Sequence, residues 1–209
     1  EDLQIATTAK RDADPARGFH WPYYYHIPTP KAGATRAPRW LLVLPNNTGR
    51  IDDDFAVHDE EAKRATERNG SLATRLDVCI LKPAFPRSQS TWRLYTHALD
   101  RDTLATDQPG LVRLDLQLLA MIDSLRAAAA AAGMPLHEKV LLVGFSASGM
   151  FVNRFALLHP DRVKAAVVGS PGGWPIVPSA RDGEEVLRYP IGVADVEELT
   201  GRPPDLAAY

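Results

Sequence analysis

Short apolar runs alternate along the chain with longer amphipathic or charged segments. The runs at 40–44, 77–81, 140–143 and 163–168 each end at a loop or a helix signal. Short, nearly continuous apolar runs are typical of parallel strands that are covered on both faces. Strands that alternate with helices predict a parallel sheet with helices on both sides. We therefore expect a doubly wound, mostly parallel α/β fold.

The segments between these runs predict the helices. Residues 58–69 are mostly charged and polar and are followed by Gly70, which predicts a surface helix that stops there. Apolar residues recur at helical spacing through 111–125, and the alanine run 127–132 extends that helix. A further helix is expected over 150–158.

The rest of the chain is less regular. The aromatic stretch 20–28 predicts an outer strand followed by a turn. Residues 82–107 form a long loop in this interpretation, and long loops are often functional. After Gly169 the chain becomes rich in Pro and Gly, so 170–209 is expected to be a lid or insertion segment of a single domain, 1–209.

Charge and length exclude some classes of partner. The 209 residues hold 24 Lys and Arg against 26 Asp and Glu, a formal charge of -2, without the basic excess that nucleic-acid binding needs. No apolar run approaches the roughly 20 residues of a membrane span. Small, neutral or polymeric organic substrates remain open.

Two further features concern redox state and compartment. The single cysteine, Cys79, excludes an intrachain disulfide, and its apolar surroundings predict a buried structural thiol. A chain that starts at Glu1 rather than Met is consistent with removal of a leader. A secreted or periplasmic location is therefore one expectation, and the compartment stays open.

The strongest chemical signal is Ser146, which stands between a predicted strand and a predicted helix. A nucleophilic serine must project from the backbone, and a sharp strand-to-helix turn achieves this if the residues two before and two after are small. Gly144 and Ser148 occupy those positions, with serine where a second glycine is usual. Ser146 is the predicted nucleophile. The alternative is that Ser146 or Ser148 only caps the following helix.

Acyl transfer also needs backbone N–H groups that stabilise the developing oxyanion. The residue after the nucleophile usually supplies one, which is Ala147 here. The loop after an earlier strand usually supplies the other, and the polar loop 45–49 follows such a strand. We expect Asn47 in this role, with Asn46 next. The alternative is an Asn/Gly turn that tolerates positive φ angles.

Three segments together, 143–149, 45–49 and 159–163, resemble the α/β-hydrolase superfamily, in particular bacterial esterases and polyester-depolymerase-like members. The resemblance covers most of 20–175. It implies a serine hydrolase that forms an acyl-enzyme without a metal or organic cofactor, and a chain order of serine, acid and histidine. Segment 95–102 is also similar to this group, without an assigned role.

The acid and the histidine are not evident in the sequence. All six histidines precede position 160, and Asp182, Asp195 and Asp205 follow no convincing strand. One explanation is that the chain is the N-terminal part of a longer protein. In that case its last strands, with the Asp and the His, lie on a C-terminal fragment, because strand 163–168 would otherwise be an unpaired hydrophobic edge. The other explanation is an upstream base, for which His97 is the best candidate.

Other residues have weaker assignments. Trp92, Trp174 and His97 lie on loops expected near the site and are candidate substrate-binding residues, against plain packing roles. His159 is expected to cap or pack. Residues 100–102 are expected to form a salt-bridge cluster. Acidic residues and His58 within 58–61 lack a third ligand at metal spacing, so no metal site is predicted.

The leading function is hydrolysis of carboxylic esters, small or polymeric, through Ser146. Two alternatives are a peptidase or amidase on the same fold and a binding protein that keeps the fold without catalysis. No nucleic acid, metal or organic cofactor is expected to take part.

Overall fold

The computed structural model describes residues 3–30 and 37–209 of the chain. A six-stranded sheet forms its centre, in the order β1-β2-β4-β3-β5-β6. Its strands are β1 (Thr8–Arg11), β2 (Tyr23–His26), β3 (Leu41–Val43), β4 (Cys79–Pro83), β5 (Val140–Phe145) and β6 (Val163–Gly169). The last four are mutually parallel, whereas β1 and β2 are antiparallel to their neighbours. The predicted doubly wound, mostly parallel α/β fold is confirmed.

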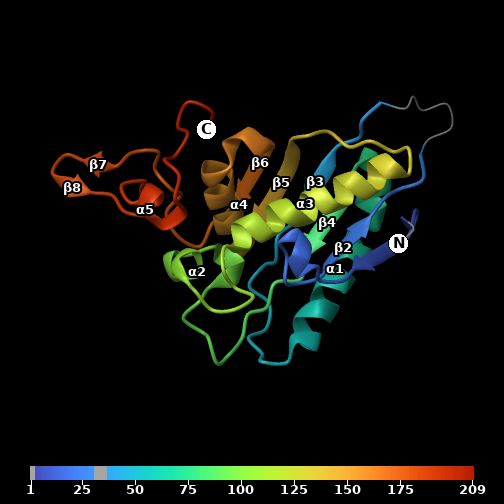
Figure 1. Ribbon diagram of the computed structural model, residues 1–209, viewed down its shortest axis with the longest axis horizontal. Coiled ribbons are helices and arrows are strands. Elements are labelled where there is room, and N and C mark those ends of the chain that lie inside the picture. The colour runs from blue at the N-terminus through green and yellow to red at the C-terminus, as the bar shows by residue number, and fades with distance from the viewer. Residues whose placement is uncertain (1–2, 31–36) are drawn as a thin grey trace.

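Helices cover the sheet, as Figure 1 shows. The α-helices are α1 (Phe55–Leu76), α2 (Arg101–Ala105), α3 (Leu114–Ala131), α4 (Ala147–Leu158) and α5 (Val196–Thr200). Short 3-10 turns occur at η1 (Pro15–Arg17), η2 (Thr96–Ala98) and η3 (Pro160–Arg162). Alternate side chains of a strand point to opposite faces. Leu41 and Val43 therefore join the core that contains α3 and α4, while Leu42 packs with Ala73 of α1.

The predicted end of the first helix at Gly70 is wrong. Helix α1 continues through this glycine and ends before Asp77, which adopts a left-handed conformation. A Cβ atom at Gly70 would lie 3.1 Å from Cε1 of His26 on β2. The glycine thus allows α1 to approach the sheet closely, and a glycine inside a helix can have this packing role as well as a terminating one.

The aromatic stretch 20–28 forms β2, but β2 is not the outer strand. The short, more polar β1 pairs with it antiparallel and occupies the edge. All four residues of β2 are buried.

Two segments are more ordered than their sequences predict. Residues 82–107 continue β4 and then form η2 and α2. Residues 170–209 contain a hairpin of β7 (Arg181–Asp182) and β8 (Glu185–Val186), which projects from the body in Figure 1, followed by α5. Tyr189 and Val193 of this segment are buried in the main core. Its assignment as a lid or insertion stays a prediction.

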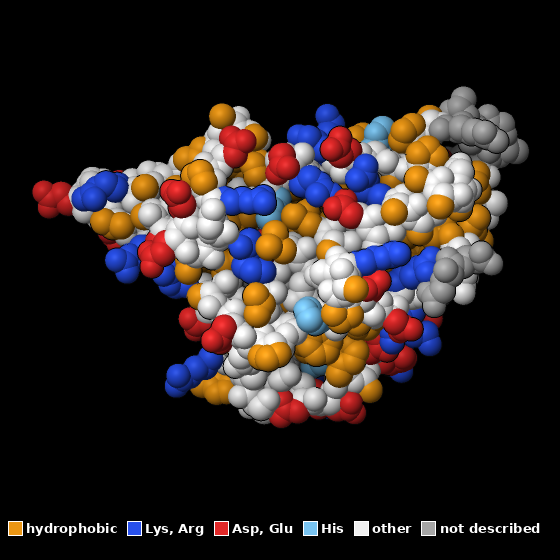
Figure 2. All heavy atoms as spheres, viewed as in Figure 1, with side chains coloured by type: hydrophobic (Ala, Val, Ile, Leu, Met, Phe, Trp, Pro, Cys, Tyr) orange, Lys and Arg blue, Asp and Glu red, His pale blue; other side chains and the backbone are white. Residues whose placement is uncertain are grey.

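The surface carries both charge signs. Figure 2 shows acidic and basic side chains interspersed over the face in view. None of the helices in the described parts of the chain is long and apolar enough to cross a membrane. Cys79 is buried, and burial raises the pKa of its thiol to about 11, which suits a structural role.

Candidate active site

Ser146 occupies a tight turn between β5 and α4. Its backbone has φ 59° and ψ -124°, a strained conformation for a residue with a side chain. Its N–H donates to the Gly169 carbonyl at the end of β6. A Cβ atom at Gly144 would lie 2.1 Å from the Ser148 carbonyl oxygen, so the turn requires glycine there. The sequence context therefore produces the sharp turn that was expected around Ser146.

The hydroxyls of Ser146 and Ser148 have different environments. Ser148 Oγ accepts from the Phe145 N–H at 2.9 Å and donates to the Phe145 carbonyl at 2.9 Å. Ser148 thus braces the turn, which accounts for serine in place of the usual glycine. Ser146 begins the helix without a side-chain capping bond, and its half-buried hydroxyl has no hydrogen-bond partner in the described parts of the chain. This arrangement does not support the capping alternative for Ser146.

The loop after β3 lies at the same edge of the sheet as this turn. Val43, the last residue of β3, pairs with Leu142 on β5, and Asn47 and Ser146 each follow four residues later in their own segments, beyond the same ends of these parallel strands. Neither the Asn46 nor the Asn47 N–H finds an acceptor within 3–30 or 37–209. Ala147, the first residue of α4, also has a free N–H, because the first N–H groups of a helix lack intrahelical partners. Three unpaired donors therefore stand at neighbouring strand ends.

His97 lies beneath this loop, not at an open surface. Only 2% of it is exposed. Nδ1 is 2.6 Å from the Asn47 carbonyl oxygen, and Nε2 is 2.8 Å from the Phe85 carbonyl oxygen. Burial lowers the pKa of His97 to about 4, against the opposing effect of the two carbonyls. At this pKa the imidazole is neutral and has one N–H, so one ring nitrogen donates to a carbonyl and the other lies close to the second carbonyl. Neither nitrogen is open to Ser146, so the geometry favours the structural alternative for His97 over a base or a substrate contact.

The other five histidines are also placed away from Ser146 or bonded elsewhere. His26 packs beneath Gly70, His58 contacts the Asp52 carbonyl, His137 stacks on Trp40, His159 bonds Asp115, and His20 lies beside Gly110. The three downstream aspartates have similar structural settings: Asp182 lies on the hairpin, Asp195 binds Arg101 and Tyr189, and Asp205 accepts from Ala208. The described residues therefore supply no histidine or carboxylate partner to the Ser146 hydroxyl.

His159 and residues 100–102, which were expected to be structural, make different contacts. His159 Nε2 is 2.9 Å from Asp115 Oδ2, and Arg113 binds both oxygens of the same carboxylate. Asp100 caps α2 through the Thr103 N–H. His159 thus has the packing role that was expected. Among the described residues Asp100, Arg101 and Asp102 form no ion pair with one another, and Arg101 pairs with Asp195 instead.

Exposed aromatic side chains lie next to the turn and on the loops that follow β4 and β6. Phe145, next to Ser146, is 62% exposed, and Trp174 is 81% exposed. The loop that carries Trp174 reaches the start of α4, because a Cβ atom at Gly172 would lie 3.3 Å from Cε of Met150. Trp92 is also exposed. Sequence reasoning missed Phe145, because the alternation of buried and exposed residues within β5 is hidden by a continuous apolar run.

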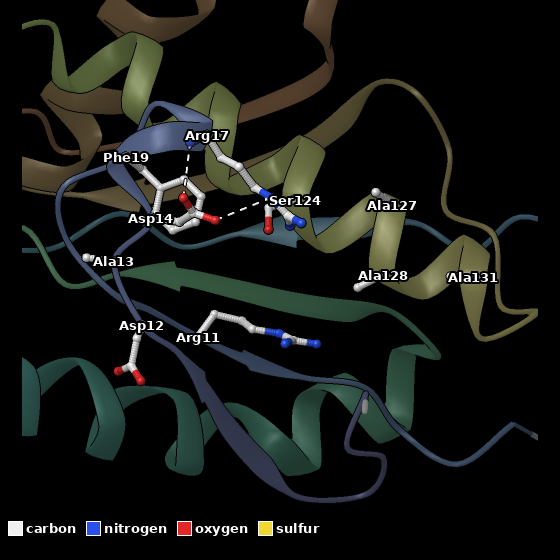
Figure 3. Close-up of a pocket in the computed structure, with 10 residues that line it drawn as sticks. All are labelled: Arg11, Asp12, Ala13, Asp14, Arg17, Phe19, Ser124, Ala127, Ala128 and Ala131. Carbon is white, nitrogen blue, oxygen red and sulfur yellow. Dashed lines mark hydrogen bonds and ion pairs between the residues drawn. The ribbon is translucent and has the colours of Figure 1, made fainter. Parts of the chain in front are cut away.

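A hollow of about 530 Å³ lies elsewhere, between η1, the end of β1 and the alanine-rich face of α3 (Figure 3). Arg11, Asp14 and Arg17 line it, and Asp14 bonds Arg17. Since β1 is four strands away from β5, this hollow is separate from the Ser146 turn.

Comparison with known proteins places the fold. The sequence matches no protein-family model and no curated protein. Among solved structures, a poly(aspartic acid) hydrolase from Sphingomonas sp. KT-1 is similar with a TM-score of 0.59 and 19% identity over 96% of this chain. A poly(3-hydroxybutyrate) depolymerase from Bordetella parapertussis is similar with a TM-score of 0.55 and 22% identity over 89%. The chain has the α/β-hydrolase fold.

The predicted α/β-hydrolase fold is thus confirmed by structures whose sequences differ widely from this one. The chain spans 70% of the length of the Sphingomonas protein and 56% of the Bordetella protein. On this fold the turn at Ser146 and the loop at Asn46 and Asn47 become the candidate active site.

Proposed function

We propose that the protein is a serine hydrolase that cleaves carboxylic esters through an acyl-enzyme on Ser146. The observation that carries the proposal is the strained turn at φ 59°, which leaves the Ser146 hydroxyl unbonded, together with three N–H groups without acceptors that follow β3 and β5. A positioned nucleophile and preorganised oxyanion donors are the two elements that acyl transfer requires.

In the proposed reaction, Ser146 Oγ attacks the ester carbonyl and loses its proton to a base. The carbonyl oxygen becomes an oxyanion, which accepts hydrogen bonds from the Ala147 N–H and from Asn47 or Asn46. Collapse breaks the bond to the alcohol, which takes the proton from the base and leaves an acyl-Ser146. Water then attacks the acyl-Ser146 carbonyl and gives its proton to the same base, and collapse returns that proton to Ser146 Oγ and releases the acid.

The base in this proposal is a histidine oriented by a carboxylate, and both come from outside the described residues. This placement is supported because, within 3–30 and 37–209, the histidines contact groups other than the Ser146 hydroxyl. The open β6 side of the turn is where the family resemblance implies that these groups enter. The C-terminal fragment that carries them therefore remains a proposal.

Phe145 and Trp174 are the proposed substrate walls. Their exposed aromatic surfaces, one next to Ser146 and one on the loop after β6, suit apolar acyl or alcohol groups and extended polyester chains. Trp92 is a weaker candidate, since its ring contacts Arg93 of its own loop.

Two alternative functions have observations in their favour. One structural neighbour is named as a hydrolase of poly(aspartic acid), which is a polyamide. This name favours amide hydrolysis as a second candidate activity. The missing histidine partner favours a binding protein that retains the fold.

Turnover of a p-nitrophenyl ester and of the matching p-nitroanilide by the full native protein tests these functions together. We expect ester turnover that Ser146→Ala abolishes and that Ser71→Ala, at an exposed position on α1, leaves unchanged. Faster anilide turnover would favour the amidase. Absence of turnover in the wild type, or full activity of Ser146→Ala, would refute the proposal.

A further inference from the structure

Buried donors hold the carbonyl groups of the loop that follows β3. Lys82 on β4 is buried, and its Nζ donates to the Leu44 and Pro45 carbonyls at 3.2 Å and 3.0 Å. In a trans peptide the N–H points opposite to the carbonyl of the preceding residue. The Pro45 carbonyl points at Lys82, so the Asn46 N–H in the same peptide plane points away from the buried side.

His97 holds the next part of the loop in the same way. Its Nδ1 is 2.6 Å from the Asn47 carbonyl oxygen, and its Nε2 is 2.8 Å from the Phe85 carbonyl oxygen. The Phe85 N–H in turn donates to Asn46 Oδ1 at 3.2 Å. The neutral imidazole carries a single N–H, which the shorter distance places on Nδ1, so His97 donates to the Asn47 carbonyl while Nε2 lies against the chain after β4. The peptide that contains the Asn47 N–H lies between the two peptides that Lys82 and His97 hold.

The segment that carries His97 is also fixed to the helix that starts after Ser146. Arg154 on α4 is buried, and its Nη1 donates to the Ala98 carbonyl at 2.6 Å. The Tyr189 hydroxyl donates to the Leu99 carbonyl. The residues on the C-terminal side of His97 are thus fixed relative to α4, while the imidazole itself is fixed to the loop. One buried segment connects both parts of the candidate site.

We propose that His97 is a positioning residue, whose Nδ1–H donates to the Asn47 carbonyl and keeps the Asn46 and Asn47 N–H groups directed at the oxyanion formed on Ser146. This inference rests on the proposed function. His97 touches neither the substrate nor Ser146, and acts through the backbone of the loop. It gives a role to segment 95–102, which neither the sequence nor the proposed mechanism had assigned.

A pair of variants separates the two contacts of the imidazole. The side-chain amide nitrogen of His97→Asn takes the place of Nδ1 and can keep the bond to the Asn47 carbonyl. That of His97→Gln takes the place of Nε2 and can donate only to the Phe85 carbonyl. His97→Asn thus keeps the hydrogen bond of the wild type, whereas His97→Gln exchanges it for one to the Phe85 carbonyl. Each variant retains one buried hydrogen bond, so their stabilities should be similar.

The activities of the pair should differ. We expect His97→Gln to lower kcat by about 10- to 100-fold with little change in KM, since loss of a whole oxyanion donor costs about 100- to 1000-fold. His97→Asn should retain more than about a third of the wild-type kcat. Order parameters of the Asn46 and Asn47 amides, measured by 15N relaxation, should fall in His97→Gln and stay near the wild-type values in His97→Asn.

His137→Gln is the control for stability alone, because His137 stacks on Trp40 at the amino end of β3. It should lower Tm and leave kcat unchanged. Equal kcat losses in the two His97 variants, or unchanged order of the loop amides in His97→Gln, would overturn the positioning role. If the wild type is as inactive as Ser146→Ala, the proposed function fails, and the amide dynamics alone decide whether His97 fixes the loop.

Discussion

The two strands that flank β5 have similar apolar sequences and very different surroundings. On one side, β3 is buried throughout, and the loop that follows it is held by buried donors. On the other side, residues 164–167 of β6 are exposed, and among the described residues β6 pairs with β5 alone. The turn at Ser146 and the proposed N–H donors are therefore supported on the β3 side, while the β6 side is open.

This difference shows how a site can be half built by one region of a sheet. The proposed oxyanion donors depend on backbone geometry, which β3, β4 and η2 fix by packing. A base and its carboxylate depend on side chains, and the β6 side of the described residues offers none. The apolar sequences of β3 and β6 predict equal burial for both strands. The difference in their exposure therefore arises from the tertiary structure.

The largest expected effect is at the turn that separates the two sides. Gly144→Val should destabilise the protein by about 4 kcal/mol or more, because a Cβ atom would lie 2.1 Å from the Ser148 carbonyl oxygen. Gly133→Asn is the control, since that glycine has φ +73° with nothing within 4 Å, and asparagine tolerates this conformation. Urea unfolding measures both, and a Gly144→Val variant as stable as the control would contradict the turn geometry.

The next effect tests the buried ion pair between Asp115 on α3 and His159 at the end of α4. Burial alone would raise the pKa of Asp115, but hydrogen bonds from Arg113 and His159 outweigh it and lower the pKa to about 2. Asp115→Asn should therefore cost about 3 kcal/mol at neutral pH, the typical result of breaking a buried ion pair. Asp123→Asn, which breaks an exposed pair with Arg162, should cost less than about 1 kcal/mol.

The same carboxylate sets an acid limit. Its folded-state pKa lies below the ordinary value of 3.8, so its contribution is present above about pH 4 and is lost as the pH falls toward 2. Unfolding curves from pH 7 to pH 2 should show the wild type and Asp115→Asn converging below pH 4. A constant difference over that range would refute this account of the pair.

The smallest effect compares the two flanking strands directly. Val43→Thr on β3 places a hydroxyl at a fully buried site and should cost about 2 kcal/mol, whereas Val167→Thr on β6, 58% exposed, should change stability by less than about 0.5 kcal/mol. Denaturant unfolding of the 209-residue chain measures both. Repeating Val167→Thr in the full native protein would detect a covering segment, because a large cost there would show that Val167 is buried by it.

Much of the fold could be predicted from the sequence, because parallel strands and their helices leave strong hydrophobic periodicity. The strand-to-helix turn at Ser146 was also predictable, because small residues flank the serine at fixed spacing between a periodic strand and a periodic helix. Gly70 misled the prediction because a glycine that admits a neighbouring strand looks like one that ends a helix. The role proposed for His97 had no local signal, because its partners Asn47 and Phe85 are backbone carbonyls distant in sequence.

The most direct test of the central claim is covalent labelling of the full native protein with a fluorophosphonate, followed by proteolysis and mass spectrometry. The account predicts one phosphonyl adduct, on the peptide that contains Ser146, absent in Ser146→Ala and retained in Ser71→Ala. An adduct on another residue, or no adduct in the wild type, would contradict the claim that Ser146 is the nucleophile.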